Sequence, residues 1–146
     1  MTVEELSGEI DIANASLGAV LIQPLTYHPY EDAAITYVGT DANIVEGVTI
    51  GAYLVEFTRT PTALSGATWL GLITSSNGEV IGMLLPPTAG GRISSSVSRE
   101  IELPLPNSPS SNRSFGVIFV MANDSGGSVA TTCFVHVRHG KRKEDE

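Results

Sequence analysis

The sequence has little of what most recognisable active sites require. Its single cysteine, Cys133, excludes an intrachain disulfide and lies in the strand-like run 129–135, which favours a small buried residue over a nucleophile. Lys141 and Lys143 are the two lysines of the chain, and both lie in its final charged segment. The body therefore has no lysine for a phosphate-binding loop or for a Schiff base.

Basic charge is scarce throughout, with 8 Lys and Arg against 16 Asp and Glu and a net charge of −8. The three bases and three acids of residues 141–146 cancel, so the remaining body alone carries that charge. Such a body repels phosphate and anionic lipid, so we expect no nucleic-acid partner and no membrane partner. No apolar run approaches the ~20 residues of a membrane span. The acidic start, residues 1–6, does not resemble a signal peptide, so we expect synthesis in the cytoplasm without secretion.

The composition is otherwise that of one folded domain built from short strands. Hydrophobic residues make up 42% and charged residues only 16% of the 146 residues, which is apolar for a soluble chain. Glycine and proline recur between runs that are rich in β-branched residues, and no segment has a long helical period. We predict an all-β fold, an antiparallel β-sandwich or jelly-roll-like domain with eight to ten short strands.

Two pairs of runs predict hairpins within this domain. Residues 67–73 and 79–85 flank Asn77-Gly78, which suits a type I′ turn, and Pro86-Pro87 is expected to end the second strand. Residues 115–122 and 128–138 are expected to pair through the turn 123–127. We place the sandwich at residues 10–139, after an N-terminal segment 1–9 and before a charged, mobile C-terminal tail 140–146.

Two strands are apolar on both faces, although an antiparallel sheet with one solvated face should alternate. Residues 115–122 and 49–57 show this pattern. A loop, a further strand layer or another subunit could cover the second face. The candidate oligomer-interface residues on that face are Tyr53, Val55, Phe57, Ile118 and Val120.

No arrangement of residues predicts catalysis, a metal site or a cofactor. His136 and His139 are three apart on one strand and should point to opposite faces, so they cannot share a metal. Glu100 and Glu102 alternate cleanly with Ile101 and Leu103, which favours a solvated outer face over a catalytic pair. Tyr27, His28 and Tyr30, beside Pro29, are candidates for an exposed aromatic ligand contact.

The strand-rich, cysteine-poor organisation resembles the small jelly-roll or sandwich modules of viral capsids, capsid decoration proteins and phage appendages. The run 114–120 and the Asn77-Gly78 turn carry this resemblance, which includes no family motif. It implies a structural, self-associating shell, protrusion or decoration module of a virion, without catalysis. The chain lacks a basic N-terminal arm, which favours an outer part over one that contacts the genome. The alternative is a β-sandwich that binds a carbohydrate or a protein ligand through its loops.

Overall fold

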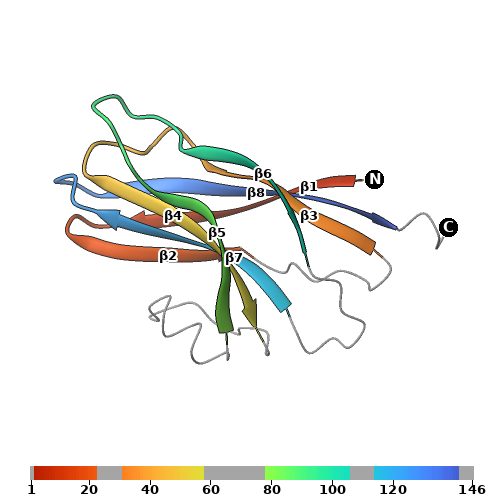
Figure 1. Cartoon of the computed structure of the whole chain (residues 1–146). Helices are drawn as coiled ribbons and strands as arrows, with labels where there is room; N and C mark the ends of the chain where they lie inside the picture. Colours follow the sequence, from red (N-terminus) through yellow and green to blue (C-terminus); the bar gives the residue numbers. More distant parts are fainter. Residues whose placement is uncertain (1, 23–30, 58–77, 106–113, 142–146) are drawn as a thin grey trace.

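The computed structural model describes residues 2–22, 31–57, 78–105 and 114–141, which fold into two layers of strands (Figure 1). The strands are β1 (Thr2–Ile12), β2 (Ser16–Ile22), β3 (Glu31–Thr40), β4 (Val48–Phe57), β5 (Gly78–Ala89), β6 (Ser98–Pro104), β7 (Ser114–Asn123) and β8 (Val129–Lys141). Every ladder between them is antiparallel. Within these four stretches there is no helix that could cross a membrane. The predicted all-β sandwich is confirmed.

The order of the strands shows how the two sheets arise. Sheet A has the order β1-β8-β3-β6, and sheet B has the order β2-β7-β4-β5. The pairs β4·β5, β3·β6, β2·β7 and β1·β8 are nested, as in one long hairpin folded between β4 and β5. The further pairs β3·β8 and β4·β7 roll this hairpin into two sheets. This arrangement of eight strands is a jelly roll.

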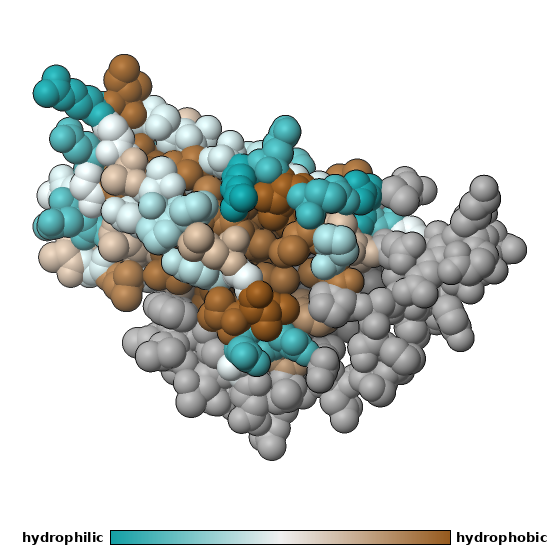
Figure 2. Space-filling view, in the orientation of Figure 1, coloured by the Kyte–Doolittle hydropathy of each residue, from teal (hydrophilic) through white to brown (hydrophobic). Residues whose placement is uncertain are grey.

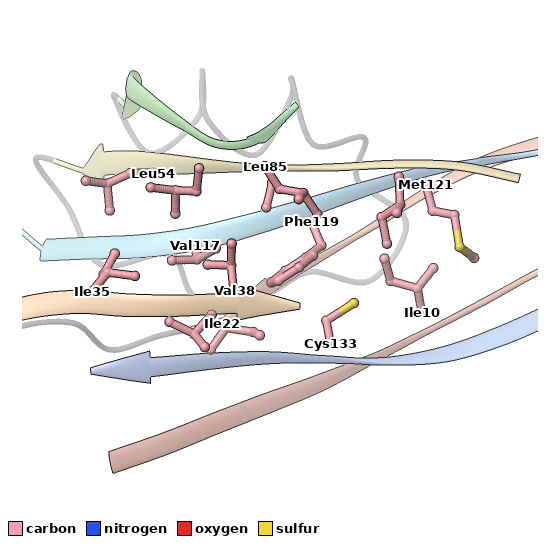
Figure 3. Close-up of a cluster of buried hydrophobic side chains, with 14 of the residues drawn as sticks. Ile10, Ile22, Ile35, Val38, Leu54, Leu85, Val117, Phe119, Met121 and Cys133 are labelled. Carbon is pink, nitrogen blue, oxygen red and sulfur yellow. The ribbon is translucent and has the colours of Figure 1, made fainter. Parts of the chain in front are cut away.

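Apolar side chains from both sheets fill the space between them (Figure 3). Alternate residues of the central strands point into this core, because successive side chains of a strand face opposite sides of the sheet. The most buried contributors are Ile35, Val38, Ile44, Ile50, Val117, Phe119, Met121, Cys133, Val135 and Val137. Burial of this continuous apolar layer is the main stabilising contribution to the fold.

The hairpin predicted over residues 115–138 is wrong. β7 pairs with β2 and β4 in sheet B, whereas β8 pairs with β1 and β3 in sheet A. The residues between them, 124–128, therefore carry the chain from one sheet to the other. A short segment rich in Asn, Asp, Ser and Gly suits both a hairpin turn and such a crossing, so the local pattern could not separate them.

The side chain of Asn123 holds this crossing in place and is buried. Its amide nitrogen donates to the carbonyl oxygens of Ile12, at 3.2 Å, and Gly127, at 2.8 Å. Its amide oxygen accepts from the backbone nitrogen of Ser125, at 3.0 Å, and from the hydroxyl of the same residue, at 2.7 Å. One side chain thus links the end of β1 to the β7–β8 connection.

The hairpin predicted around Asn77-Gly78 lies only partly within the described residues. Its second arm is β5, which pairs with β4, while its first arm, 67–73, is outside them. The prediction that Pro86-Pro87 ends the strand is wrong, because β5 continues to Ala89. Both prolines fall at a shift of register between the pairs Ala52↔Leu85 and Ile50↔Thr88 on an edge strand. Proline is tolerated at such a bulge because no ladder N–H is needed there.

The first and the last strand of the chain are longer than the sequence pattern predicts. β1 begins at Thr2 because Thr2 pairs with His139, and β8 extends to Lys141, opposite Glu31. The start of β1 and the end of β8 therefore lie at the same end of the sandwich (Figure 1). The connections β1–β2, β3–β4, β5–β6 and β7–β8 lie at the opposite end.

Candidate interaction surfaces

The outer face of sheet B carries a second apolar cluster, separate from the core. Leu21, Val55, Phe57 and Ile118 form it, and Tyr53 and Val120 pack against it. The pairs Tyr53↔Ile118 and Leu21↔Ile118 bring these residues together from β4, β7 and β2. The two-sided apolar pattern of β4 and β7 therefore reflects two distinct clusters, one on each face of sheet B.

Three of the five predicted interface residues are inaccessible in the single chain. Val55 and Phe57 have 0% and Ile118 has 1% of their surface exposed, so a partner could not touch them without a rearrangement. Tyr53 and Val120 are partly exposed at the margin of the cluster. An interface role for these five residues stays a prediction. The apolar residues that a partner could reach lie mainly on a neighbouring strand.

The largest group of accessible apolar residues in sheet B lies on the edge strand β5. Val80, Ile81 and Met83 have 42%, 41% and 53% of their surface exposed, and we call these three residues the β5 patch. Met83 pairs with Tyr53 and Val80 pairs with Val55, so the patch adjoins the second cluster. Figure 2 shows brown, hydrophobic atoms gathered where Figure 1 places β5.

Sequence reasoning missed the β5 patch because its exposure depends on irregular pairing. The ladder between β4 and β5 shifts register at three places. Leu84 and Leu85, although adjacent, are both buried in the core, while Met83 points outward. A strict alternation of inward and outward residues cannot anticipate this pattern. A run of seven residues with one charge, 79–85, was the only available signal.

The outer face of sheet A has many charged side chains and carries one ordered line of residues. Glu5 on β1 pairs with His136 on β8, His136 pairs with Tyr37 on β3, and Tyr37 pairs with Glu100 on β6. We call these four residues the Tyr37 row. The Glu5 Oε2 and His136 Nε2 atoms are 2.7 Å apart, and the Tyr37 and His136 ring centroids are 4.6 Å apart. The row crosses all four strands of the sheet.

An ion pair lies beside this row. The Arg138 guanidinium on β8 donates to both carboxylate oxygens of Glu102 on β6, and the small residue Ala34 occupies the strand between them. Hydrogen bonding to Glu102, and then its charge, raise the pKa of Arg138. Glu102 is thus engaged by an arginine, and both Glu100 and Glu102 lie on the exposed face as predicted.

The structure also places the other residues that the sequence analysis considered for chemistry. Cys133 is buried in the core, where burial, and then the charge of Asp41, raise the pKa of its thiol to about 12. His139 lies 3.3 Å from Glu4, on the face of sheet A opposite His136 and Glu5. No group of three or more His, Cys, Asp or Glu side chains in the described ranges could hold a metal ion. Tyr27, His28 and Tyr30 lie outside those ranges.

The comparisons with known proteins concern the fold. No protein-family model and no curated protein matches the sequence. A solved structure of infectious bursal disease virus, Gx strain, aligns with 97% of the chain at a TM-score of 0.53 and 10% identity. The infectious bursal disease virus VP2 subviral particle aligns with 95% at a TM-score of 0.50 and 10% identity. The chain shares its fold with a protein of virus particles. It spans about a third of the length of these solved chains, 33% in both cases.

Proposed function

We propose that this domain is a structural, self-associating module of a virion or a similar assembly, and that copies meet at the β5 patch. The observation that carries the proposal is an exposed apolar patch on the edge of a jelly roll whose fold occurs in virus particles. Contiguous exposed apolar residues mark interaction sites more often than isolated ones do. The net charge of −8 favours a position away from the genome, because an acidic body repels nucleic acid.

The geometry favours contact through side chains of β5 over a continuous sheet between copies. Pro86 and Pro87 have no backbone N–H with which to extend a ladder, and the pairing of β5 is irregular. Both features disfavour pairing of this edge with another strand. Val80, Ile81 and Met83 can instead bury apolar surface against a second copy, which is a favourable, non-directional interaction.

The test is the solution mass of the full chain, measured by light scattering during size-exclusion chromatography over a wide concentration range. We expect a closed oligomer for the wild type and a shift to monomer for the double variant Val80→Glu with Met83→Glu. Val3→Glu and Leu17→Glu are matched controls, because Val3 and Leu17 are 63% and 62% exposed on the edge strands β1 and β2. A monomeric wild type at all concentrations would overturn self-association, and an oligomeric double variant would overturn the β5 patch as its site.

A cross-linking experiment locates the contact independently. Met83→Cys introduces an accessible thiol, whereas the native Cys133 is buried with a raised pKa and should not react. We expect oxidation to give disulfide-linked dimers of Met83→Cys and none of Leu17→Cys. Equal cross-linking of the two variants would indicate random collision instead of a β5 interface.

A further inference from the structure

Met83 is the member of the β5 patch that carries an oxidisable atom. Of the three methionines of the chain, Met1 lies outside the described residues. Met83 has 53% of its surface exposed, whereas Met121 has 0% and lies in the core between the sheets (Figure 3). An oxidant dissolved in water therefore reaches the thioether sulfur of Met83 much more readily than that of Met121.

The single cysteine does not compete with Met83 for an oxidant. Cys133 is buried, with 0% of its surface exposed. Burial, and then the charge of Asp41, raise the pKa of its thiol to about 12, so little of the reactive thiolate forms near neutral pH. Among the sulfur atoms of the described residues, oxidation therefore falls on Met83.

The pairing of β5 with β4 places Met83 beside Val80 on one face. Met83 pairs with Tyr53, which packs against the second apolar cluster on the outer face of sheet B. Val80 pairs with Val55, a member of that cluster, and Val55 is two residues from Tyr53 on β4. Residues that pair across a ladder share a face of the sheet, so Met83 and Val80 both lie on the outer face. A second copy that covers Val80 therefore covers Met83 as well.

A peroxide oxidises an accessible thioether in one step. The sulfur of Met83 attacks an oxygen atom of hydrogen peroxide with its lone pair, so an S–O bond forms and the O–O bond breaks. The hydroxide that leaves takes the proton from the bound oxygen and departs as water. The sulfur is oxidised by two electrons, the peroxide is reduced, and the product is the polar methionine sulfoxide.

We infer that Met83 is a redox-sensitive modification site, and that its oxidation by a peroxide prevents copies from meeting at the β5 patch. This consequence rests on the proposed self-association. The side chains of Val80 and Ile81 have no hydrogen-bond donor, so a sulfoxide oxygen buried against them loses its bonds to water without replacement. Assembly covers Met83, so the oxidant modifies unassembled chains first and keeps them apart. Reduction of the sulfoxide by methionine sulfoxide reductases reverses the change.

The test treats the full-length wild-type chain with dilute hydrogen peroxide and then measures modification, fold and mass separately. Mass spectrometry of its peptides should show one added oxygen atom on Met83 and none on Met121, and circular dichroism should not change. Light scattering should show a shift from oligomer to monomer, with at least an about tenfold rise in the dissociation constant. Methionine sulfoxide reductases with a thiol reductant should restore the oligomer.

Two variants separate the chemistry of the sulfur from its position. Met83→Leu keeps an apolar side chain of similar volume without sulfur, so it should assemble like the wild type and stay assembled in peroxide. Adding Leu17→Met to that variant places a thioether on β2, at a position that is 62% exposed and outside the patch. This methionine should be oxidised without any loss of assembly.

The inference fails if the oxidised wild type keeps its oligomeric mass, if Met121 is oxidised as fast as Met83, or if peroxide dissociates Met83→Leu equally. Each of these results leaves self-association intact, because the untreated wild type still forms an oligomer. A wild type that is monomeric before treatment instead overturns the proposed function and this inference together.

Discussion

At the scale of single residues, the core tolerates one ionisable group by keeping it neutral. Cys133 lies between apolar residues of both sheets, and its thiol has a pKa of about 12 against an ordinary value of 9.0 (Figure 3). Burial in a medium of low polarity disfavours the thiolate, and the charge of Asp41 adds to this effect. Folding therefore favours the protonated thiol.

This raised pKa predicts a loss of stability in alkaline solution. The unfolded chain releases the thiol proton as the pH rises through 9, while the folded chain retains it until about pH 12. The titration of Cys133 therefore leaves the free energy of unfolding unchanged well below pH 9. Above pH 9 it lowers that free energy, with a slope that approaches about 1.4 kcal/mol for each pH unit. Urea unfolding between pH 8 and pH 11 measures this slope.

Cys133→Ala is the control for that slope. The variant has a small cavity and a lower stability at pH 8, but it lacks the titrating group. We expect the difference between wild type and variant to shrink by about 1 kcal/mol between pH 9 and pH 10, where half of the unfolded thiols are already ionised at the start. A difference that does not change with pH would show that the thiol titrates as it does in the unfolded chain.

At the scale of elements, the segment between β7 and β8 carries the chain from sheet B to sheet A, and Asn123 holds it in place. Asn123→Ala removes the two donors to Ile12 and Gly127 and the acceptor for Ser125. Because Asn123 is buried, these groups lose their partner where water cannot easily replace it. We expect a loss of about 2–3 kcal/mol in the free energy of unfolding, measured with urea.

Asn14→Ala provides the comparison for Asn123. Asn14 is exposed and accepts one hydrogen bond, from the backbone nitrogen of Gly126 at 2.8 Å. Water can replace that bond, so we expect a loss below about 1 kcal/mol. Equal effects of the two substitutions would contradict the role given to Asn123.

The elements also show which parts of the fold the sequence determines locally. Alternation and glycine or proline positions were sufficient to predict strands near β4, β5, β6, β7 and β8, because a strand needs only a local pattern. The pairing of β7 with β2 and β4, instead of β8, depends on residues far apart in the chain. The β5 patch and the Tyr37 row depend on bulges and on register across sheets, so neither was predicted. Tyr37 and Glu100 come together only through the pairing of β3 with β6.

At the scale of the whole molecule, the jelly roll brings the start of β1 and the end of β8 together. Thr2 pairs with His139, and both β1 and β8 belong to sheet A. The connection between β5 and β6 lies at the other end of the sandwich and contains Gly90-Gly91. Of these two glycines, Gly91 has open space where a side chain would be, so a break there disturbs little packing.

This arrangement predicts that a circular permutant will fold. We expect a chain opened after Gly91, with the original ends joined by a flexible glycine–serine linker, to melt within about 10 °C of the wild type. Opening instead within β7, after Phe119, should prevent folding because it divides a central strand of sheet B. Calorimetry distinguishes the two, and equal stability would contradict the strand order.

The nested pairing also has a consequence for how the protein is made. The innermost pair, β4 and β5, is complete once Ala89 of the 146 residues has been translated. β1 has to wait for β8, its hydrogen-bonded neighbour. β2 likewise has to wait for β7, its one neighbour in sheet B. β3 and β4 lack a second neighbour until β8 and β7 are made. Most long-range contacts therefore form late, and such topologies fold slowly. During translation the apolar faces of the early strands lie open, so nascent chains should depend on chaperones that hold exposed strands until the last one emerges.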